Sequence, residues 1–188
     1  MKLISREEQH EFAPFDLTKT PKFDKKKDKV ELSIQSFELA NTYFRAAQIL
    51  FSNRGFIVYM PVILTNIAFS CELYLKALLH GYNIDFGNTH DLKDLFDKLP
   101  DSIKEYVAEN IAIENREREF PLCLKEQNSA FTTYRYMNEV KSISANPQFL
   151  FAFAHVLSFV YSILTEHPDE HSREEDCQHE KNDKIIDI

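Results

Sequence analysis

Two long apolar stripes joined by a short link constrain this chain more than any other feature. Apolar side chains recur every three or four residues over 30–51 and again over 64–79, a period typical of helices with one buried face. Gly55 is placed to end the first helix. Pro61 is placed in the first turn of the second helix, and Gly81 is placed to end that second helix. We therefore predict two helices, each roughly 30 Å long, that lie antiparallel because the link between them is short.

The rest of the chain continues in helical patterns without strand signals. The expected elements are a short helix from Leu92 that Pro100 stops, a helix over 102–111, a charged connector over 114–119, and helices over 124–140 and 147–164. With only three Gly, the chain lacks the many tight turns of β-sandwiches and barrels. The predicted fold class is all-α, an antiparallel bundle of about five to six helices.

Polar segments flank the predicted bundle. Residues 1–29 form a polar, basic arm, residues 30–165 the bundle, and residues 166–188 an acidic tail. The arm carries six lysines between Thr18 and Lys29, and it is either a solvated leader or a segment that contacts nucleic acid. The tail holds too little apolar area to offset its ordering entropy, so we predict that it is disordered.

The composition of the chain and the absence of several known motifs exclude some classes of function. The net charge of -8 argues against a general grip on a phosphate backbone, although it permits a local basic patch. The three scattered cysteines fit neither a disulfide framework nor a zinc site. Because nucleotide-loop and metalloprotease motifs are also missing, we expect no metal and no cofactor. Residues 1–29 lack an apolar leader, and residues 149–164 fit a core helix better than a membrane span, so we expect a cytoplasmic protein without a membrane partner.

Polar residues at helical spacing form the candidate site. The candidate polar cluster consists of Glu72, Lys76, His90, Asp91, Arg135, Tyr136 and Glu139, with His80 and His155 as weaker candidates. Glu72 and Lys76 are four residues apart on one helix, and Arg135 and Glu139 repeat that spacing on a later one. Two interpretations stay open. The cluster is either a layer of salt bridges across the bundle, or a site whose cations bind phosphate or carboxylate.

Three short motifs follow one another along the chain. They are Glu72-Leu-Tyr-Leu-Lys76-Ala-Leu-Leu79, then His90-Asp91-Leu92, then Arg135-Tyr136-Met-Asn-Glu139. In this order they resemble a prokaryotic branch of the HEPN domain family, over about residues 33–164. The resemblance implies a helical bundle that commonly forms a homodimer. It also implies an association with RNA cleavage, nucleotide binding, toxin–antitoxin pairs or antiviral defence, and hence with an antitoxin or another partner protein.

The chain departs from the family at one position that matters for catalysis. Ribonucleases of the family carry Arg and His on one helix with four to six residues between them, a pair suited to metal-independent cleavage in which His transfers a proton and Arg stabilises the phosphorane. In this sequence only Arg173 and His179 have that spacing, and they belong to the tail. The leading hypothesis is therefore a module that binds a nucleotide, RNA or a partner protein in a defence or toxin–antitoxin setting. The alternatives are a metal-independent endoribonuclease with a non-standard site and a purely structural dimerisation domain.

Overall fold

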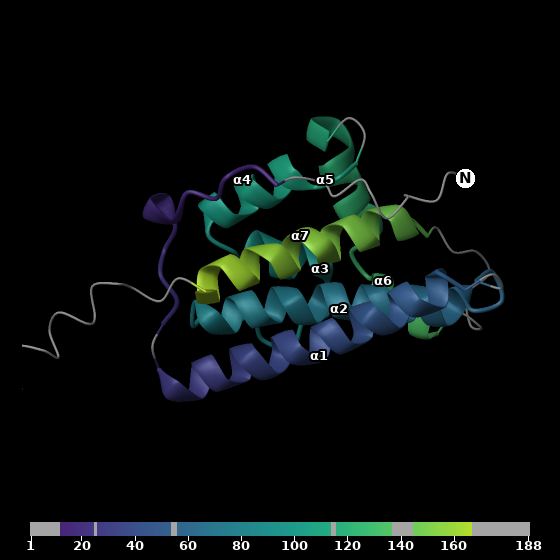
Figure 1. Ribbon diagram of the computed structural model, residues 1–188, viewed down its shortest axis with the longest axis horizontal. Helices are drawn as coiled ribbons and strands as arrows, with labels where there is room; N and C mark the ends of the chain where they lie inside the picture. Colours follow the sequence, from purple (N-terminus) through teal and green to yellow (C-terminus); the bar gives the residue numbers. More distant parts are fainter. Residues whose placement is uncertain (1–11, 25, 54–55, 114–115, 137–144, 167–188) are drawn as a thin grey trace, which may run out of the picture.

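The computed structural model of the chain describes residues 12–24, 26–53, 56–113, 116–136 and 145–166 (Figure 1). The elements in chain order are the 3₁₀ helix η1 Leu17–Lys19 and the α-helices α1 Lys27–Phe51, α2 Met60–Gly81, α3 Leu92–Asp97, α4 Asp101–Asn110, α5 Arg116–Glu126, α6 Ala130–Arg135 and α7 Pro147–Glu166. No strand occurs among the described residues, which confirms the all-α prediction, and α-helices are more numerous than expected.

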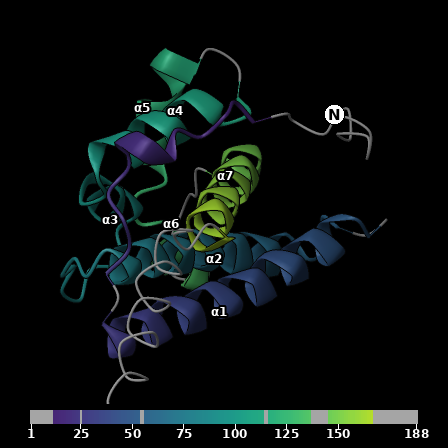
Figure 2. The same cartoon turned by 60° about the vertical axis from the view of Figure 1, so that its left-hand side comes forward.

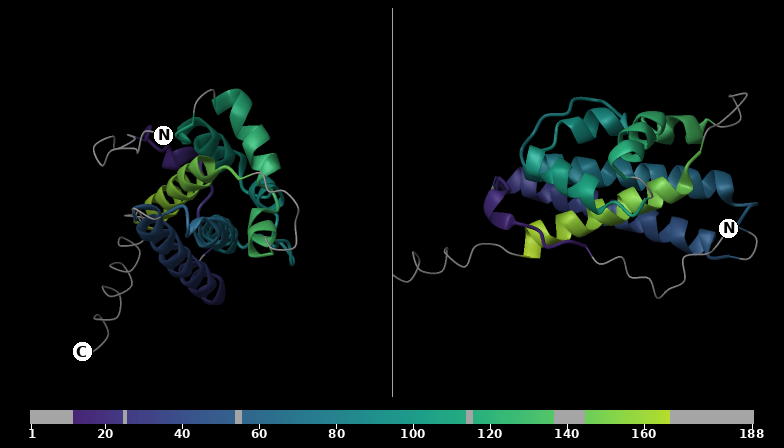
Figure 3. Two further views of the ribbon diagram at one scale, coloured as in Figure 1. Left: turned by 90° about the vertical axis from the view of Figure 1, so that its right-hand side faces the viewer. Right: turned by 90° about the horizontal axis from the view of Figure 1, so that it is seen from above.

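Helices α1 and α2 form the predicted antiparallel hairpin (Figures 1 and 2). Pro61 lies at the start of α2, where its missing N–H leaves no helical bond unmade. Helix α7 packs on α2 beside α1, so α2 is the central helix and most of its side chains are buried. Helix α1 has α2 as its main neighbour and lies at the edge of the bundle (Figure 3).

The shorter helices complete the bundle around α2 and α7. Helices α3 and α6 pack on α2, α4 packs on α7, and α5 contacts α3 and α4. Phenylalanine rings join them: Phe96 of α3 lies 5.4 Å from Phe120 of α5 and 5.8 Å from Phe153 of α7, between ring centroids. Each such ring buries a large apolar area. These contacts hold α3 in place, and the segment that enters α3 carries His90.

The charged connector expected over residues 114–119 is wrong, because α5 begins at Arg116. The buried face of this helix comes from Phe120, Cys123 and Leu124, which are three and four residues apart. The charged run therefore belongs in part to an amphipathic helix whose apolar side begins only in its second turn.

The single helix expected over residues 124–140 is interrupted. Helix α5 ends at Glu126 and α6 begins at Ala130, while residues 137–144 lie outside the described part of the chain. The loop between the two helices contacts the start of α3, since the N–H of Leu92 donates to the carbonyl oxygen of Asn128 over 2.8 Å. The break thus connects α6 to the segment that carries His90.

Residues 12–24 of the arm lie against the bundle (Figure 2). Phe12 stacks on Phe159 of α7 with ring centroids 4.2 Å apart, and Phe23 meets Tyr82 edge-on at 4.8 Å. The backbone is held as well, because the Tyr106 hydroxyl donates to the carbonyl oxygen of Ala13 over 2.7 Å. This part of the arm differs from the solvated leader expected for it, since its phenylalanines anchor it despite the lysines between them.

Among the described residues, two helices, α2 and α7, are long and apolar enough to cross a membrane, judged by length and composition alone. Both contribute many side chains to the core of the bundle, and a core helix passes the same test. The apolar window is 72% buried in α2 and 44% buried in α7.

Candidate functional site

A buried carboxylate lies in the central helix. Glu72 is the only charged residue that is fully buried in the described part of the chain, with its side chain 1% exposed. Its position follows from the fold, because α2 is covered on most sides and its polar residues are enclosed with its apolar ones. A buried charge is costly unless it is paired and hydrogen-bonded, so its partners define the site.

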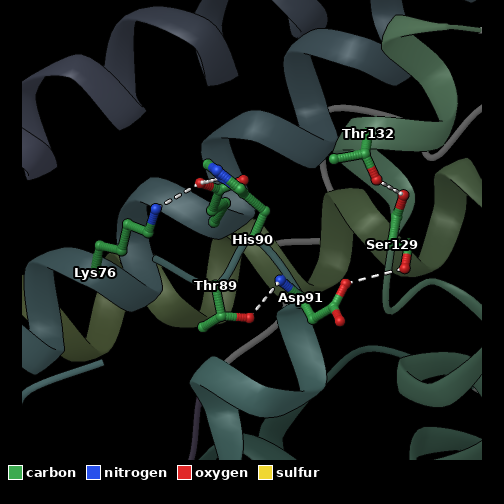
Figure 4. Close-up of polar contacts among 7 residues, drawn as sticks. Lys76, Thr89, His90, Asp91, Ser129 and Thr132 are labelled. Atoms are coloured by element: carbon green, nitrogen blue, oxygen red, sulfur yellow. Dashed lines mark hydrogen bonds and ion pairs between the residues drawn. The ribbon is translucent and has the colours of Figure 1, made fainter. Parts of the chain in front are cut away.

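Two donors reach the same oxygen of this carboxylate (Figure 4). Lys76 Nζ, one turn further along α2, donates to Glu72 Oε1 over 2.8 Å, and His90 Nδ1 contacts the same oxygen at 2.8 Å. An ionised carboxylate can only accept, so His90 Nδ1 is the donor. The other oxygen, Glu72 Oε2, is buried and has no hydrogen-bond partner among the described residues. Lys76 and His90 are therefore the two hydrogen-bond partners of this buried carboxylate among the described residues.

The two donors differ in their access to solvent. The Lys76 side chain is 17% exposed, whereas the His90 side chain is 52% exposed. With Nδ1 directed at Glu72, the second ring nitrogen of His90, Nε2, is the one available to a ligand. Glu72 thus fixes the orientation of an accessible imidazole.

Hydrogen bonds fix the segment that carries His90 (Figure 4). The N–H of Asp91 donates to Thr89 Oγ1 over 3.2 Å, and the Ser129 hydroxyl donates to Asp91 Oδ1 over 2.9 Å. The N–H of Lys93 donates to Asn128 Oδ1 over 2.8 Å. The loop between α5 and α6 therefore supplies partners for the first backbone N–H groups of α3, which have none within the helix.

Aromatic rings lie beside the imidazole. The centroid of the Phe131 ring on α6 is 6.3 Å from that of His90, and Phe131 stacks on Phe69 of α2 at 4.4 Å. Arg135 follows Phe131 by four residues, which places it one turn further along the same side of α6. We call the set of Lys76, His90, Phe131 and Arg135 the His90 face: Lys76 and His90 share Glu72, and Phe131 and Arg135 share one side of α6.

The remaining candidates do not join Glu72. Arg135 is exposed and does not form the predicted bridge to Glu72, and its guanidinium carbon lies 5.4 Å from the ring centroid of its neighbour Tyr136. Glu139 lies outside the described residues. The ring of His155, on α7, lies 5.1 Å from that of Phe12 in the arm.

His80 also turns away from the carboxylate. Its ring meets Phe86 edge-on at 5.0 Å. Burial lowers the pKa of His80, and the positive charges of Lys29 and Lys76 lower this pKa further. The environment therefore favours the neutral imidazole at this position.

Two contributors to the site were not among the candidate site residues predicted from the sequence. Phe131 fits the pattern of a core residue, and Ser129 belongs to a turn that was predicted to be helix. Their contacts to His90 and Asp91 bridge about forty residues of chain. No group of three or more His, Cys, Asp and Glu side chains is arranged to hold a metal ion within the described ranges.

Comparison with known proteins identifies the family. A family model described as HEPN domain matches residues 35–160, which is more than half of the chain and includes Glu72, Lys76, His90 and Arg135. No curated protein and no solved structure matches the chain. The matched region begins within α1 and ends within α7. Every element that the structure describes in this region is a helix, and HEPN is a helical domain. The chain belongs to the HEPN domain family.

Proposed function

We propose that this HEPN domain binds a phosphate-bearing ligand, a nucleotide or single-stranded RNA, on the His90 face. HEPN domains are known for ribonuclease and nucleotide-binding roles. The observation that supports the proposal is the bond from His90 Nδ1 to the buried Glu72, which orients an imidazole that is half open to solvent. A purely structural histidine would be expected to bury its ring or to satisfy both nitrogens within the fold.

The chemistry of the face suits a phosphate beside a base. The Arg135 guanidinium offers a planar fork of hydrogen bonds to phosphate oxygens, and His90 Nε2 donates to them in the imidazolium form, since Nδ1 already directs its proton at Glu72. Lys76, which is paired with Glu72 and 17% exposed, adds positive charge beside the imidazole. Phe131, which is partly buried, offers an aromatic ring near the imidazole, and aromatic rings stack on bases in single-stranded complexes. These local cations make binding compatible with the overall charge of -8.

The proposal is tested by fluorescence anisotropy of the full chain with a labelled single-stranded RNA, with AMP as competitor. We expect His90→Ala and Arg135→Ala each to weaken RNA binding about tenfold, since each removes a charge-assisted or oriented hydrogen bond. Arg135→Ala should also reduce the salt slope of binding by about one. The control is Lys104→Ala, which removes a lysine paired with Asp101 on α4. Equal affinities for wild type, His90→Ala and Arg135→Ala would contradict the proposal.

A second candidate function is metal-independent RNA cleavage at the same face. The observation that favours it is that Glu72 orients His90 through Nδ1 while Arg135 lies one turn from the ring that His90 contacts. His90 Nε2 would take the proton of a ribose 2′-hydroxyl as that oxygen attacks phosphorus, and Arg135 would stabilise the charged phosphorane before the 5′-oxygen leaves. The Arg and His would thus come from two elements rather than from one helix.

Incubation of RNA with the full chain in a metal chelator tests this candidate. Cleavage that disappears in His90→Ala, and that spares an all-deoxy strand of the same sequence, is the expected result. His155→Ala serves as the matched control, because His155 contacts the arm instead of Glu72. Binding without cleavage would leave the ligand proposal standing and remove the ribonuclease candidate.

The cellular setting is proposed from the family resemblance. We place the protein in the cytoplasm of a prokaryote, in a toxin–antitoxin pair or an antiviral system, with a partner protein and no membrane partner. HEPN domains are typically soluble and commonly dimerise, which supports the location. Co-purification of the tagged full chain with the product of its neighbouring gene is the test, and a chain that purifies alone from its native cell would contradict the setting.

A further inference from the structure

The turn from α1 into α2 exposes a group of large apolar side chains. Ile57 is 74% exposed and Val58 is 80% exposed, whereas Phe56 and Met60 of the same turn pack against the core. We call the exposed group the hairpin tip; it consists of Ile49, Ile57, Val58, Tyr59 and Val62. Concentrated apolar exposure of this kind marks a surface that another molecule or segment covers.

The sequence around the hairpin tip lacks acidic residues. Residues 39–71 contain no Asp or Glu, and their charged residues are Arg45 and Arg54. Helix α7 begins beside the tip, since the ring centroids of Phe51 and Phe151 lie 5.1 Å apart, and α7 holds no acid before its last residue. An acidic segment with apolar side chains therefore suits the tip better than a basic one.

Other parts of the described surface carry exposed acids. Glu31 and Glu38 are exposed in the first half of α1, Asp94 in α3, Glu105 in α4 and Glu126 in α5. Negative charge on these helices repels an acidic segment, within the distance that salt allows. The hairpin tip is therefore the apolar surface on which such a segment meets little repulsion.

Residues 167–188 have the composition that this surface requires. They contain eight Asp and Glu against three Lys and Arg, and their large aliphatic residues are Ile185, Ile186 and Ile188. Three isoleucines cannot form a core of their own, because ordering the chain around them costs as much as their burial yields. They can be buried only on an apolar surface that already exists.

The chain is long enough to bring these isoleucines to the hairpin tip. Helix α7 begins beside the tip and ends at the opposite end of the bundle (Figure 1). Its 20 residues span about 30 Å. The 18 residues between Glu166 and Ile185 can span roughly 60 Å, which exceeds the way back. A segment joined to the bundle also meets the tip at a high effective concentration.

We propose that Ile185, Ile186 and Ile188 dock on the hairpin tip of the same chain, so that the acidic segment runs from the end of α7 back to the turn between α1 and α2. The segment supplies both the apolar side chains and the negative charge that residues 39–71 lack. Docking removes the exposed side chains of the tip from water and from nonspecific association. The proposal uses none of the residues of the His90 face, so it stands independently of the ligand.

Tryptophan fluorescence of the full chain tests the proposal. The sequence contains no Trp, so Val58→Trp introduces a single indole that reports on the hairpin tip alone. Its emission and its quenching by acrylamide are compared with those of a chain in which Ile185, Ile186 and Ile188 are also replaced by Ser. Loss of the isoleucines should shift the emission to longer wavelength and raise the quenching constant at least about twofold, because the indole loses its apolar cover.

Leu122→Trp is the matched control, because Leu122 is 48% exposed on α5, which contacts α3 and α4. The same serine replacements should leave its emission and quenching unchanged, and circular dichroism confirms that each variant is folded. Equal emission and quenching of the tip indole with and without the isoleucines overturns the proposal. So does shielding of this indole that grows with protein concentration, which assigns the tip to a second copy. Shielding that arises only with phosphatidylglycerol vesicles assigns it to a lipid surface and overturns the proposal as well.

Discussion

At the scale of single residues, the polar part of this bundle is organised by one buried carboxylate. Glu72 accepts hydrogen bonds from Lys76 and His90 on a single oxygen, and both donors extend from it toward solvent. Because Glu72 Oε2 is buried without a partner among the described residues, loss of either donor should cost stability. The same group therefore contributes to stability and holds a side chain that can meet a ligand.

Replacement of Glu72 by Gln should destabilise the protein. The substitution keeps the shape of the side chain and removes the charge that strengthens both hydrogen bonds, so we expect a loss of about 1–2 kcal/mol in the free energy of unfolding. Urea unfolding measures the loss. In combination with His90→Ala, the two effects should be less than additive, and additive effects would show that the two residues act separately.

Acidification should weaken the fold through His80. Its pKa is lowered in the folded protein by burial and by Lys29 and Lys76, whereas in the unfolded chain it titrates near its ordinary value of about 6.5. As the pH falls through that value, the unfolded state takes up the proton first, and stability decreases. Between about pH 7.5 and 5.5, His80→Gln should lose less stability than wild type, as measured by urea midpoints. An equal loss in both proteins would contradict this assignment.

The sequence shows only part of this residue-level picture. The pair of Glu72 and Lys76 was predictable, because residues four apart on a helix are neighbours. The contact of His90 with the same oxygen depends on how the chain enters α3, and that path is fixed by Asn128 and Ser129, more than thirty residues away. Local spacing carries no information about such contacts.

At the scale of elements, long helices were predicted better than short ones. The hairpin of α1 and α2 is set by apolar periods that run over many turns, so its position is evident from the sequence. Helices α5 and α6 have few turns, and α5 begins inside a charged run whose buried face starts only at Phe120. Their bounds are set by packing against α2, α3 and α4, which a local pattern does not reveal.

The end of α2 depends on a close approach by the arm. A Cβ added to Gly81 would lie 2.7 Å from the Phe23 ring, and that ring is held by Tyr82 and Tyr161. Gly81 therefore provides room for Phe23, which the prediction of a helix-ending glycine did not include. The left-handed backbone conformation appears two residues later, at Asn83.

Substitution of Gly81 by Ala should displace the arm. Elsewhere in a helix this change stabilises by up to about 1 kcal/mol, but here the clash should destabilise by about 1–3 kcal/mol. Thermal unfolding measures the effect. In a chain that already carries Phe23→Ala, the same substitution should be neutral or stabilising. A Gly81→Ala protein as stable as wild type would show that the arm is not held at this point.

At the scale of the whole molecule, buried tyrosine hydroxyls form hydrogen bonds between helices. Burial raises the pKa of Tyr134 to about 12, and it also raises the pKa of Tyr74, Tyr82 and Tyr161. Tyr74 donates to Asn41 of α1, and Tyr161 of α7 shares a hydrogen bond with Ser33 of α1. These hydroxyls link α1, α2 and α7 while they remain protonated.

Alkaline conditions should unfold the bundle cooperatively. The unfolded chain releases tyrosine protons near pH 10, whereas the folded protein holds them to higher pH. The contribution of these protonated tyrosines to the free energy of unfolding is therefore complete below about pH 10. This contribution is lost as the pH rises beyond that value. Ultraviolet absorbance should show late ionisation of these tyrosines together with the loss of helical circular dichroism. Complete ionisation near pH 10 by a chain that is still helical would contradict the burial of these groups.

The most direct test of the proposed ligand site is an NMR titration of the imidazole nitrogens. The full chain, labelled with ¹⁵N at histidine, is titrated with AMP and separately with inorganic phosphate, and the spectrum of His90→Ala assigns the His90 signals. We predict that His90 Nε2 shifts with either ligand while Nδ1 keeps its hydrogen bond to Glu72, and that His155 is unaffected. Binding of AMP without any change at His90 Nε2 would place the ligand elsewhere and contradict the proposed site.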